Sequence, residues 1–444
     1  MANELVPAKD NKPATKKQEM DIGRVPSNFW YHIVGEEILV TLIAAFTHIK
    51  VKPDPDYLKE EGPVIVIANH ASYLDPMVMS KLTRGRPVNF VCGEFLFRNH
   101  FWGNAFKKGG AIPKKQFVVD AISVKSMMKV LKRKGVLLLF PEATRSVDGS
   151  TIAIDDGVAK MAKKVNAAIY IAHIHGAYAA MPRWGSGIRN GKITAEFVRK
   201  LPASKTAEMT ADELQKFILD GLKYNENDYQ REHKLTYKGK NLAKGLDNIA
   251  YQCPKCKEEF SMKWAGNGNG NAIVCAKCGN TAVMNVYGLL DKAKEDDVIF
   301  DDLKKWTSWE KQEVMDQLRQ GDFHMQLKAD LHKVFDDTTF ARTGAGEVTI
   351  TSTEIIYEGT DCDGKEGIPY KKGKVKSGYK NRSLDGVSKP SKHVFEIANM
   401  KGMVADYGEY FEIYDSKGEL FRFYVDGQKV YKAQLVVQLL GKIQ

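Results

Sequence analysis

Short apolar runs that alternate with helical patterns constrain the first half of this chain more than any other feature of its sequence. Four runs have the length and the β-branched composition of buried strands, at residues 64–68, 88–92, 136–140 and 168–174. Segments able to form helices lie between them, at residues 76–82, 118–133 and 158–165. Alternation of this kind predicts an α/β domain with a mostly parallel sheet and helices on both faces.

A histidine and a carboxylate follow the first of these strands. The run 64–68 leads directly into a loop that contains His70 and Asp75. Ligands of open α/β sheets bind beyond the carboxyl ends of the strands. A histidine is the side chain best suited to move protons near neutral pH, and a carboxylate can fix its tautomer. We therefore identify His70 and Asp75 as candidate catalytic residues. Because no Gly-x-Ser-x-Gly motif is visible, His70 is expected to deprotonate a hydroxyl that the substrate brings.

Both residues also have simpler interpretations. Asp75 followed by Pro76 is a good helix start, with Asp75 as the N-cap and Pro76 at the first helical position. That role is compatible with catalysis. A single histidine is more often structural, and it is the pairing of His70 with Asp75 that favours catalysis.

Two further loops carry charged residues after predicted strands or turns. Residues 141–146 (PEATRS) place a carboxylate, a hydroxyl and a guanidinium beyond the strand 136–140. Arginine is suited to bidentate capture of phosphate and stays charged when partly desolvated. Residues 109–115 place Lys114 and Lys115 after a Gly-Gly turn, which is a second candidate anion site. Each basic residue alone is typical of a solvated surface, but three such loops in one domain favour a functional site.

Together, these motifs resemble those of the PlsC-type glycerophospholipid acyltransferases, which include the lysophosphatidate acyltransferases. Asn-His-x4-Asp at residues 69–75 is followed about 65 residues later by Phe-Pro-Glu-x-Thr-Arg-Ser at residues 140–146. The resemblance covers residues 28–225. It implies transfer of a fatty acyl group from acyl-CoA or acyl-carrier protein to lysophosphatidic acid, which gives phosphatidic acid. The alternatives are glycerol-3-phosphate or another lysophospholipid as acceptor, or a lipid-binding scaffold that has lost turnover.

The resemblance also implies roles for individual residues. His70 looks like the general base and Asp75 like the carboxylate that orients it. Arg145 would hold the acceptor phosphate, and Glu142 would shape the acceptor site or bind glycerol oxygens. The implied substrate-binding residues are Glu142, Thr144, Arg145 and Lys114. Because a thioester is already activated, such an enzyme need only position the alcohol, remove its proton and stabilise an oxyanion.

The chain departs from the family pattern at three positions. Ala143 replaces the usual Gly, Lys114 stands where Arg is common, and Ala172 stands where Pro is common. Ala143 matters if a positive φ is needed there, since Gly alone adopts it freely. None of these changes removes the proposed base, so we still expect activity.

Four cysteines in two CxxC pairs, 18 residues apart, have the spacing of a zinc ribbon. The expected ligands are Cys253, Cys256, Cys275 and Cys278. Four protein ligands leave no open position, so we expect a structural zinc. Zinc ribbons often bind nucleic acid, but this hairpin is rich in Gly and Asn and has no run of basic residues, so nucleic acid is not the expected partner. His173 and His175 could form a second metal site on one strand, although structural roles are the better interpretation.

The C-terminal part has short alternating strands and a final helix. The strands are expected at residues 347–351, 354–357, 393–397, 410–414 and 420–424, and the helix at 428–442. Antiparallel strands followed by one amphipathic helix look like a pleckstrin-homology (PH) or GRAM-like barrel. The loop 363–388 is dense in Lys and Arg, which suits either anionic headgroups or solvent.

Charge and the N-terminal segment bear on the location of this protein. The formal net charge of +11 over 444 residues indicates an anionic partner, such as a membrane surface, nucleic acid or a phosphorylated substrate. The polar stretch 1–21 is not a signal peptide, and the paired cysteines favour a reducing compartment. The apolar segment 29–49 is interrupted by Glu36 and Glu37, so it favours a helix lying on a membrane or capping its own domain.

These observations predict a multidomain protein that is not secreted and that lies on the cytoplasmic face of a membrane, where it contacts anionic lipids. The expected parts are a disordered tail (1–27), an acyltransferase domain with an N-terminal interfacial helix (28–225), a linker (226–248), a zinc ribbon (249–290), a helical linker (291–330) and a β-rich PH/GRAM-like domain (331–444).

Overall fold

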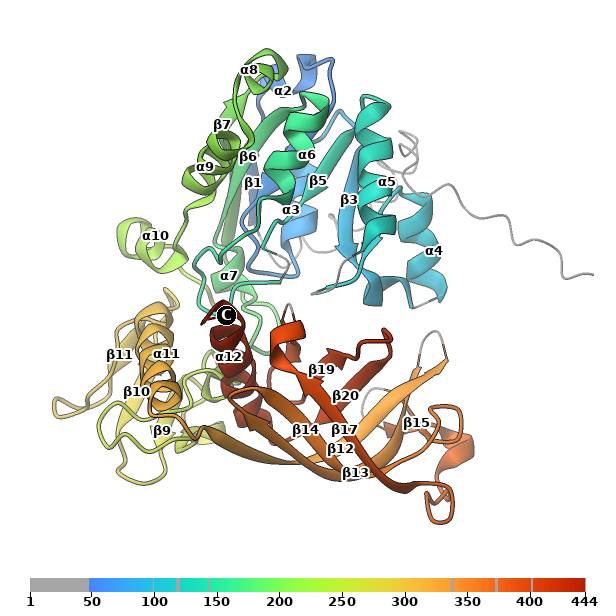
Figure 1. Cartoon of the computed structure of the whole chain (residues 1–444). Coiled ribbons are helices and arrows are strands. Elements are labelled where there is room, and N and C mark those ends of the chain that lie inside the picture. The colour runs from blue at the N-terminus through green and yellow to red at the C-terminus, as the bar shows by residue number, and fades with distance from the viewer. Residues whose placement is uncertain are drawn as a thin grey trace, which may run out of the picture.

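The computed structural model describes residues 48–98, 100–116, 120–142, 144–336, 339–371, 374–400 and 402–443. An α/β domain faces a C-terminal half that contains a small sheet, a long helix and a large antiparallel sheet (Figure 1). The tail expected over 1–27 lies outside the described residues. So does the expected interfacial helix, except for its last two residues, which begin the first strand.

The α/β domain is built on a seven-stranded sheet in the order β1-β7-β6-β2-β5-β3-β4. The strands are β1 (His48–Lys52), β2 (Val64–Ala68), β3 (Val88–Gly93), β4 (Ile112–Lys114), β5 (Val136–Leu139), β6 (Ala168–His175) and β7 (Lys192–Leu201). The five strands from β6 to β4 run parallel, as predicted. The sheet as a whole is mixed, because β7 pairs antiparallel with β6 and β1 runs parallel to β7.

Helices cover both faces of this sheet (Figure 1). They are α2 (Pro55–Lys59), α3 (Asp75–Leu82), α4 (His100–Lys108), α5 (Ala121–Lys132), α6 (Gly157–Val165), α7 (Ala177–Ala180), α8 (Ala203–Glu208), α9 (Ala211–Leu222) and α10 (Glu226–His233). In β2, Val64 and Val66 pack in the core that includes α3, while Ile65 and Ile67 pack in the core that includes α5, α6 and α9. Burial on both faces explains why β2 is apolar throughout rather than alternating.

The small sheet follows in the C-terminal half. Its antiparallel strands are β8 (Met262–Trp264), β9 (Ala272–Cys275), β10 (Thr281–Met284) and β11 (Leu290–Lys292). The segment 226–248, expected as a linker, contains α10 and the buried residues Leu242, Ala243 and Leu246, which belong to a hydrophobic core. It is therefore a packed part of the fold. Helix α11 (Leu303–Arg319) lies between the two sheets in sequence.

The large sheet is antiparallel, and its last strand is followed by a helix. It contains β12 (His324–Asp336), β13 (Thr339–Thr351), β14 (Glu354–Asp361), β15 (Ile368–Lys371), β16 (Lys374–Val375), β17 (Lys389–Glu396), β18 (Val404–Asp406), β19 (Tyr410–Tyr414) and β20 (Leu420–Tyr424), followed by α12 (Gly427–Ile443). The expected strands and final helix are present. The boundary expected at residue 331 falls inside β12, whose alternating burial at Met325, Leu327, Ala329 and Leu331 marks a strand that starts earlier.

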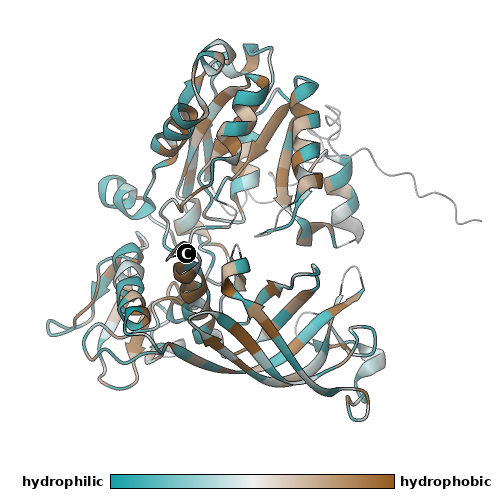
Figure 2. Ribbon diagram, in the orientation of Figure 1, coloured by the Kyte–Doolittle hydropathy of each residue, from teal (hydrophilic) through white to brown (hydrophobic). Residues whose placement is uncertain are grey.

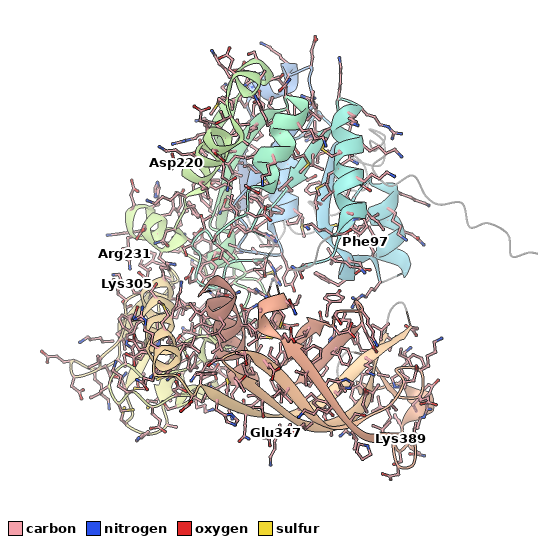
Figure 3. All side chains as sticks on the ribbon, viewed as in Figure 1. Phe97, Asp220, Arg231, Lys305, Glu347 and Lys389 are labelled. Carbon is pink, nitrogen blue, oxygen red and sulfur yellow. The ribbon has the colours of Figure 1, made fainter. Side chains whose placement is uncertain are left out.

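The two halves of the chain pack against each other. One hydrophobic core runs through the small sheet, α11, α12 and the large sheet, and it includes Trp184 of the α/β domain. Figure 2 shows α12 as a largely apolar helix between the large sheet and the α/β domain. On α10, Arg231 pairs with Asp301 at 3.0 Å and with Asp302, next to Lys305 of α11 (Figure 3). Among the described residues, no helix is long and apolar enough to cross a bilayer.

The loop after β2 is tied to β6 by a buried side chain. Asn69 donates from Nδ2 to the carbonyl of Ile174 at 3.0 Å, and its Oδ1 accepts from the Ile174 N–H at 2.8 Å. Both bonds join the first residue after β2 to a neighbouring strand, so Asn69 fixes the direction in which the chain leaves the sheet toward His70.

Replacing this amide should destabilise the α/β domain. Asn69→Ala would leave the Ile174 N–H and carbonyl without their partners in a buried place, at a cost of about 2 kcal/mol in the free energy of unfolding. We expect a lower midpoint in urea unfolding followed by circular dichroism. The matched control is Asn399→Ala, at an exposed position whose side chain bonds only Glu396. Equal midpoints for the two variants would contradict this role of Asn69.

Candidate functional site

His70 and Asp75 contact each other directly. His70 Nδ1 lies 2.8 Å from Asp75 Oδ2, and the Asp75 side chain is 1% exposed while that of His70 is 19% exposed. A buried carboxylate beside Nδ1 favours the tautomer with the proton on Nδ1, which leaves the lone pair on Nε2. The ring of Phe140 stacks on that of His70, with centroids 4.3 Å apart and an interplanar angle of 18°. The imidazole is therefore fixed both by a hydrogen bond and by a flat apolar contact.

Asp75 does not cap the helix that it begins. Helix α3 starts at Asp75 itself, Leu74 occupies the N-cap position without a side-chain hydrogen bond, and Pro76 is the second helical residue. The expected N-cap role is therefore wrong. Asp75 Oδ2 instead accepts from the backbone N–H groups of Ala71 at 2.7 Å and Ser72 at 2.8 Å. The carboxylate thus folds the preceding loop back on itself and holds His70 in it.

Glu142 joins the loop after β2 to the loop after β5. Its Oε1 accepts from the backbone N–H of His70 and its Oε2 from that of Ile152, each at 2.9 Å. In return, the Ser146 N–H donates to the His70 carbonyl at 2.7 Å. The Glu142 side chain is buried, and burial raises the pKa of its carboxyl to about 8, although the two N–H donors oppose this shift. Both oxygens of Glu142 are therefore bonded to the backbone, so Glu142 shapes the site and its described contacts are within the protein.

Arg145 contacts the ring of Tyr73, which lies in the same loop as His70 and Asp75. Its guanidinium carbon is 3.4 Å from the centroid of the Tyr73 ring, which is 48% exposed. Burial lowers the pKa of Arg145. Its Nη1 is buried without a hydrogen-bond partner, and no carboxylate of the described residues lies within 4.0 Å. A guanidinium in this state is suited to bind an anion that enters the site.

The remaining predicted substrate-binding residues differ in position. The Thr144 hydroxyl already accepts a hydrogen bond from Arg183 Nη1 at 2.7 Å, so its described contact is within the protein. Lys114 is the last residue of β4, so it lies at the carboxyl end of a strand, as the loops after β2 and β5 do. β4 is separated from β2 by two strands, which places their ends about 14 Å apart. Lys114 is thus in the row of parallel strand ends but away from the His70–Asp75 pair. Ala143 lies outside the described residues.

His173 and His175 have structural partners. His173 Nε2 lies 2.8 Å from the Gly221 carbonyl, and His175 Nδ1 lies 3.1 Å from the Tyr224 hydroxyl. The only metal-competent group among the described residues is formed by the four cysteines of the small sheet. The structural interpretation of both histidines is therefore the better one.

The four cysteine sulfurs converge on one point. All four Sγ atoms lie within 4.8 Å of one another, and the Cys253–Cys278 and Cys256–Cys275 pairs are each 3.7 Å apart. Ser261 Oγ lies 3.3 Å from Cys275 Sγ, and Asn280 Nδ2 lies 3.6 Å from Cys253 Sγ. This group can hold a metal ion.

Sequence reasoning missed three residues that contact the site. The sequence indicates no role in the site for Phe140, which ends a predicted strand. Tyr73 lies among the variable positions of the Asn-His-x4-Asp motif, and Arg183 belongs to no motif. Nothing in the spacing of the sequence signals Arg183, because it reaches the loop 141–146 only through the folding of the chain after β6.

Comparison with known proteins finds a family match within the α/β domain. Residues 48–174 match the family model described as Acyltransferase. The chain is 24% identical over 197 residues to the chloroplastic 1-acyl-sn-glycerol-3-phosphate acyltransferase LPAT1 of Arabidopsis thaliana, which covers 44% of this chain and 54% of that protein. It is 26% identical over 166 residues to the chloroplastic 1-acyl-sn-glycerol-3-phosphate acyltransferase BAT2 of Brassica napus, which covers 36% and 47% respectively. The chain thus spans about half the length of these relatives.

Among solved structures, the chain is similar to the 1-acyl-sn-glycerophosphate acyltransferase PlsC of Thermotoga maritima. The identity is 18%, the TM-score is 0.33, and the match covers 41% of this chain and 78% of that one. The matched family segment contains His70, Asp75, Glu142 and Arg145, and it ends before the cysteine group.

The raised pKa of Glu142 predicts a pH dependence of stability. In the folded chain Glu142 has a pKa of about 8, whereas the ordinary pKa of a glutamate carboxyl is 4.5. Between these values the unfolded chain binds one proton fewer, so this group lowers stability as the pH rises from about 5 to 8.

Glu142→Gln removes this titration. The stability of the native chain relative to the variant should therefore decrease across the same range, measured as the difference between their melting temperatures. A difference that stays constant or grows with pH would show that Glu142 titrates normally. At every pH the amide nitrogen of Gln cannot accept one of the two N–H bonds, so a constant loss of stability is superimposed.

Proposed function

We propose that this protein transfers a fatty acyl group from acyl-CoA or acyl-carrier protein to the free hydroxyl of lysophosphatidic acid, which gives phosphatidic acid. The observation that carries the proposal is the 2.8 Å contact between His70 Nδ1 and a buried Asp75, inside the segment that matches the Acyltransferase family model. The two plant relatives, whose names give this acceptor, support the choice of substrate.

In the proposed reaction, His70 is the general base. Nε2 takes the proton of the acceptor hydroxyl as the hydroxyl oxygen attacks the thioester carbonyl. The C–S bond then breaks, the thiolate takes up the proton, and the products are an ester and a free thiol. Asp75 stabilises the imidazolium that forms in between and keeps Nδ1–H in place. No covalent acyl-enzyme is required, because the acceptor brings its own nucleophile.

Arg145 is the proposed partner of the acceptor phosphate. Burial disfavours its charge, and its Nη1 lacks a partner, so a phosphate oxygen at this position would satisfy both the charge and the donor. The loop contacts made by Glu142 and Ser146 keep Arg145 on the loop next to His70. Lys114 lies at the carboxyl end of the outer strand β4, so it would bind an anionic part of a substrate that is distant from His70.

We further propose that the four cysteines hold a structural zinc ion. Zinc–sulfur bonds of about 2.3 Å in a tetrahedron place the sulfurs about 3.8 Å apart. The two separations of 3.7 Å fit this arrangement. Asn280 would donate to the Cys253 thiolate and so stabilise its charge. Zinc would tie the two CxxC turns of the small sheet together.

Our proposal for location is a peripheral protein on the cytoplasmic face of a membrane, with anionic lipids rather than nucleic acid as the charged partner. The net charge of +11 and the loop 363–388, which is dense in Lys and Arg, support it. The β-rich domain, an antiparallel sheet followed by α12, is proposed to be PH/GRAM-like in its use of such a surface.

The reaction is tested by thiol release from an acyl-CoA with lysophosphatidate in micelles. We expect release that needs the acceptor and that falls by about 10²–10⁴-fold in His70→Ala, since general-base catalysis has this magnitude. The matched control is His324→Ala, at an exposed histidine on β12, which should leave the rate unchanged. Equal melting temperatures of the native chain and both variants would separate catalysis from folding.

If the native chain releases no thiol, an acyl-carrier-protein donor, glycerol-3-phosphate and other lysophospholipids are the next substrates. Failure with all of them by a folded, zinc-loaded chain would contradict the proposed function and favour a lipid-binding scaffold.

Metal analysis tests the zinc proposal. We expect about one zinc per chain, and its loss in Cys256→Ser together with a lower melting temperature, because the ion joins two segments of the chain. Cys362→Ser, a cysteine outside the group, should keep the metal and serves as the control. A metal-free native chain of full thermal stability, purified without chelator, would overturn the assignment.

A further inference from the structure

The loop that carries Arg145 lies between the two halves of the protein. Val147, two residues after Arg145, packs against the hydrophobic core of the C-terminal half. Tyr178 donates its hydroxyl to the Val147 carbonyl at 3.0 Å. The loop after β5 is thus enclosed by residues from both halves, although the family match ends at residue 174.

Arg183 is the centre of this contact. Its Nη1 donates to the Thr144 hydroxyl at 2.7 Å and to the Arg145 carbonyl at 3.3 Å. The same guanidinium donates to the Tyr407 hydroxyl at 3.3 Å and to the Ala405 carbonyl, and it lies over the Tyr407 ring at 4.5 Å. One side chain therefore joins the residues on both sides of the Thr144–Arg145 peptide bond to the large sheet.

The contact continues into the last helix. Tyr407 donates its hydroxyl to Gln434 Oε1 at 2.6 Å, and Gln434 Nε2 donates to the Met403 carbonyl at 2.8 Å. Tyr407 is 8% exposed and Gln434 is 2% exposed, so this chain of hydrogen bonds is shielded from water. It holds residues 403–407 rigidly against α12, and Arg183 extends that rigid part to the loop after β5.

A second, separate contact holds the same loop. Asp148 Oδ2 accepts from the Thr307 hydroxyl of α11 at 3.0 Å and lies 3.4 Å from Lys304 Nζ. Its Oδ1 accepts from the backbone N–H of Ser150 at 2.9 Å. Residues 144–148 are therefore anchored to the C-terminal half at both ends, at Thr144 through Arg183 and at Asp148 through α11.

The charge of Arg183 has no counter-charge among its partners. Its described acceptors are two hydroxyls and two carbonyls, and no carboxylate of the described residues lies within 4.0 Å of it. A cation held by neutral groups beside Arg145 adds to the positive potential of the loop. Its geometry, however, commits Nη1 and Nη2 to the protein, so its role is to hold the loop and not to bind the ligand.

We propose that Arg183 is a positioning residue through which the β-rich domain sets the position of Arg145, so that affinity for the acceptor's phosphate depends on the C-terminal half. This inference rests on the proposed function of the Arg145 site. The C-terminal half is then a part of the acceptor site, which Arg183 joins at Thr144 and Arg145, and not an independent module on a complete enzyme.

Steady-state kinetics of the full chain test this role. Arg183→Ala should raise the KM for lysophosphatidate about tenfold or more, because this factor corresponds to the loss of hydrogen bonds from a charged group. We expect kcat to fall by a smaller factor and the KM for acyl-CoA to stay the same. Tyr407→Phe removes the hydroxyl that accepts a hydrogen bond from Arg183, 224 residues away in the sequence. Because only one of the contacts of Arg183 is lost, this variant should raise the KM for lysophosphatidate by a smaller factor. Arg183→Lys should resemble Arg183→Ala, because an ammonium cannot bridge four acceptors in this arrangement.

Arg189→Lys is the matched control. Arg189 lies in the same segment after α7 and also donates to carbonyls, those of Ala179 and Leu242, but it has no contact with residues 144–148. We expect it to lower the melting temperature and leave the KM for lysophosphatidate unchanged. If Arg189→Lys raises this KM as much as Arg183→Ala, or if Arg183→Ala lowers only the melting temperature, Arg183 is merely structural and the proposal is overturned.

Hydrogen–deuterium exchange separates this inference from the proposed function. Amides 144–150 should exchange faster in Arg183→Ala and Tyr407→Phe than in the native chain, and not in Arg189→Lys. This readout needs no turnover. An inactive native chain with faster exchange in the two variants would contradict the proposed reaction and keep the positioning role, whereas unchanged exchange in an active enzyme would overturn the positioning role alone.

Discussion

One oxygen atom, Asp75 Oδ2, accepts hydrogen bonds from the backbone N–H groups of Ala71 and Ser72 and contacts His70 Nδ1. These three contacts close the loop between β2 and α3 into a compact turn around a buried carboxylate. All three contacts fall on Oδ2, while Oδ1 of the same carboxylate is buried without a hydrogen-bond partner. The orientation of His70 toward the site depends on this turn.

The site is then assembled from two loops that the sheet topology brings together. β2 and β5 are adjacent and parallel, so the loops that follow them leave the same edge side by side. Glu142 Oε1 accepts from the His70 N–H and the Ser146 N–H donates to the His70 carbonyl, which joins the two loops, and Phe140 stacks on the His70 ring. Arg183 and Asp148 in turn connect the second loop to the C-terminal half. A series of hydrogen bonds therefore leads from His70 to α11 and α12.

Much of this could be predicted because local patterns decide it. Runs of apolar residues predicted β2, β3, β5 and β6, and these strands placed His70, Asp75 and the PEATRS segment in loops at strand ends. The CxxC pairs predicted a closed group of sulfurs. The rest depends on tertiary packing. Asp75 resembles an N-cap in sequence, but its carboxylate bonds the preceding loop instead. The segment 226–248 is charged and poor in apolar residues, yet Leu242, Ala243 and Leu246 are buried in the core of the C-terminal half. Arg183 contacts residues more than 220 positions away, which no local pattern can reveal.

The central claim is that His70 activates the acceptor's own hydroxyl, with no nucleophile from the protein. The most direct test mixes the chain at a concentration near that of the acyl-CoA, with and without lysophosphatidate, and follows thiol release together with the mass of the protein and the lipid product. We predict no thiol release without the acceptor, and with it equal amounts of free thiol and phosphatidate. A rapid release of one thiol per chain without the acceptor, with the acyl group found on the protein, would contradict this account.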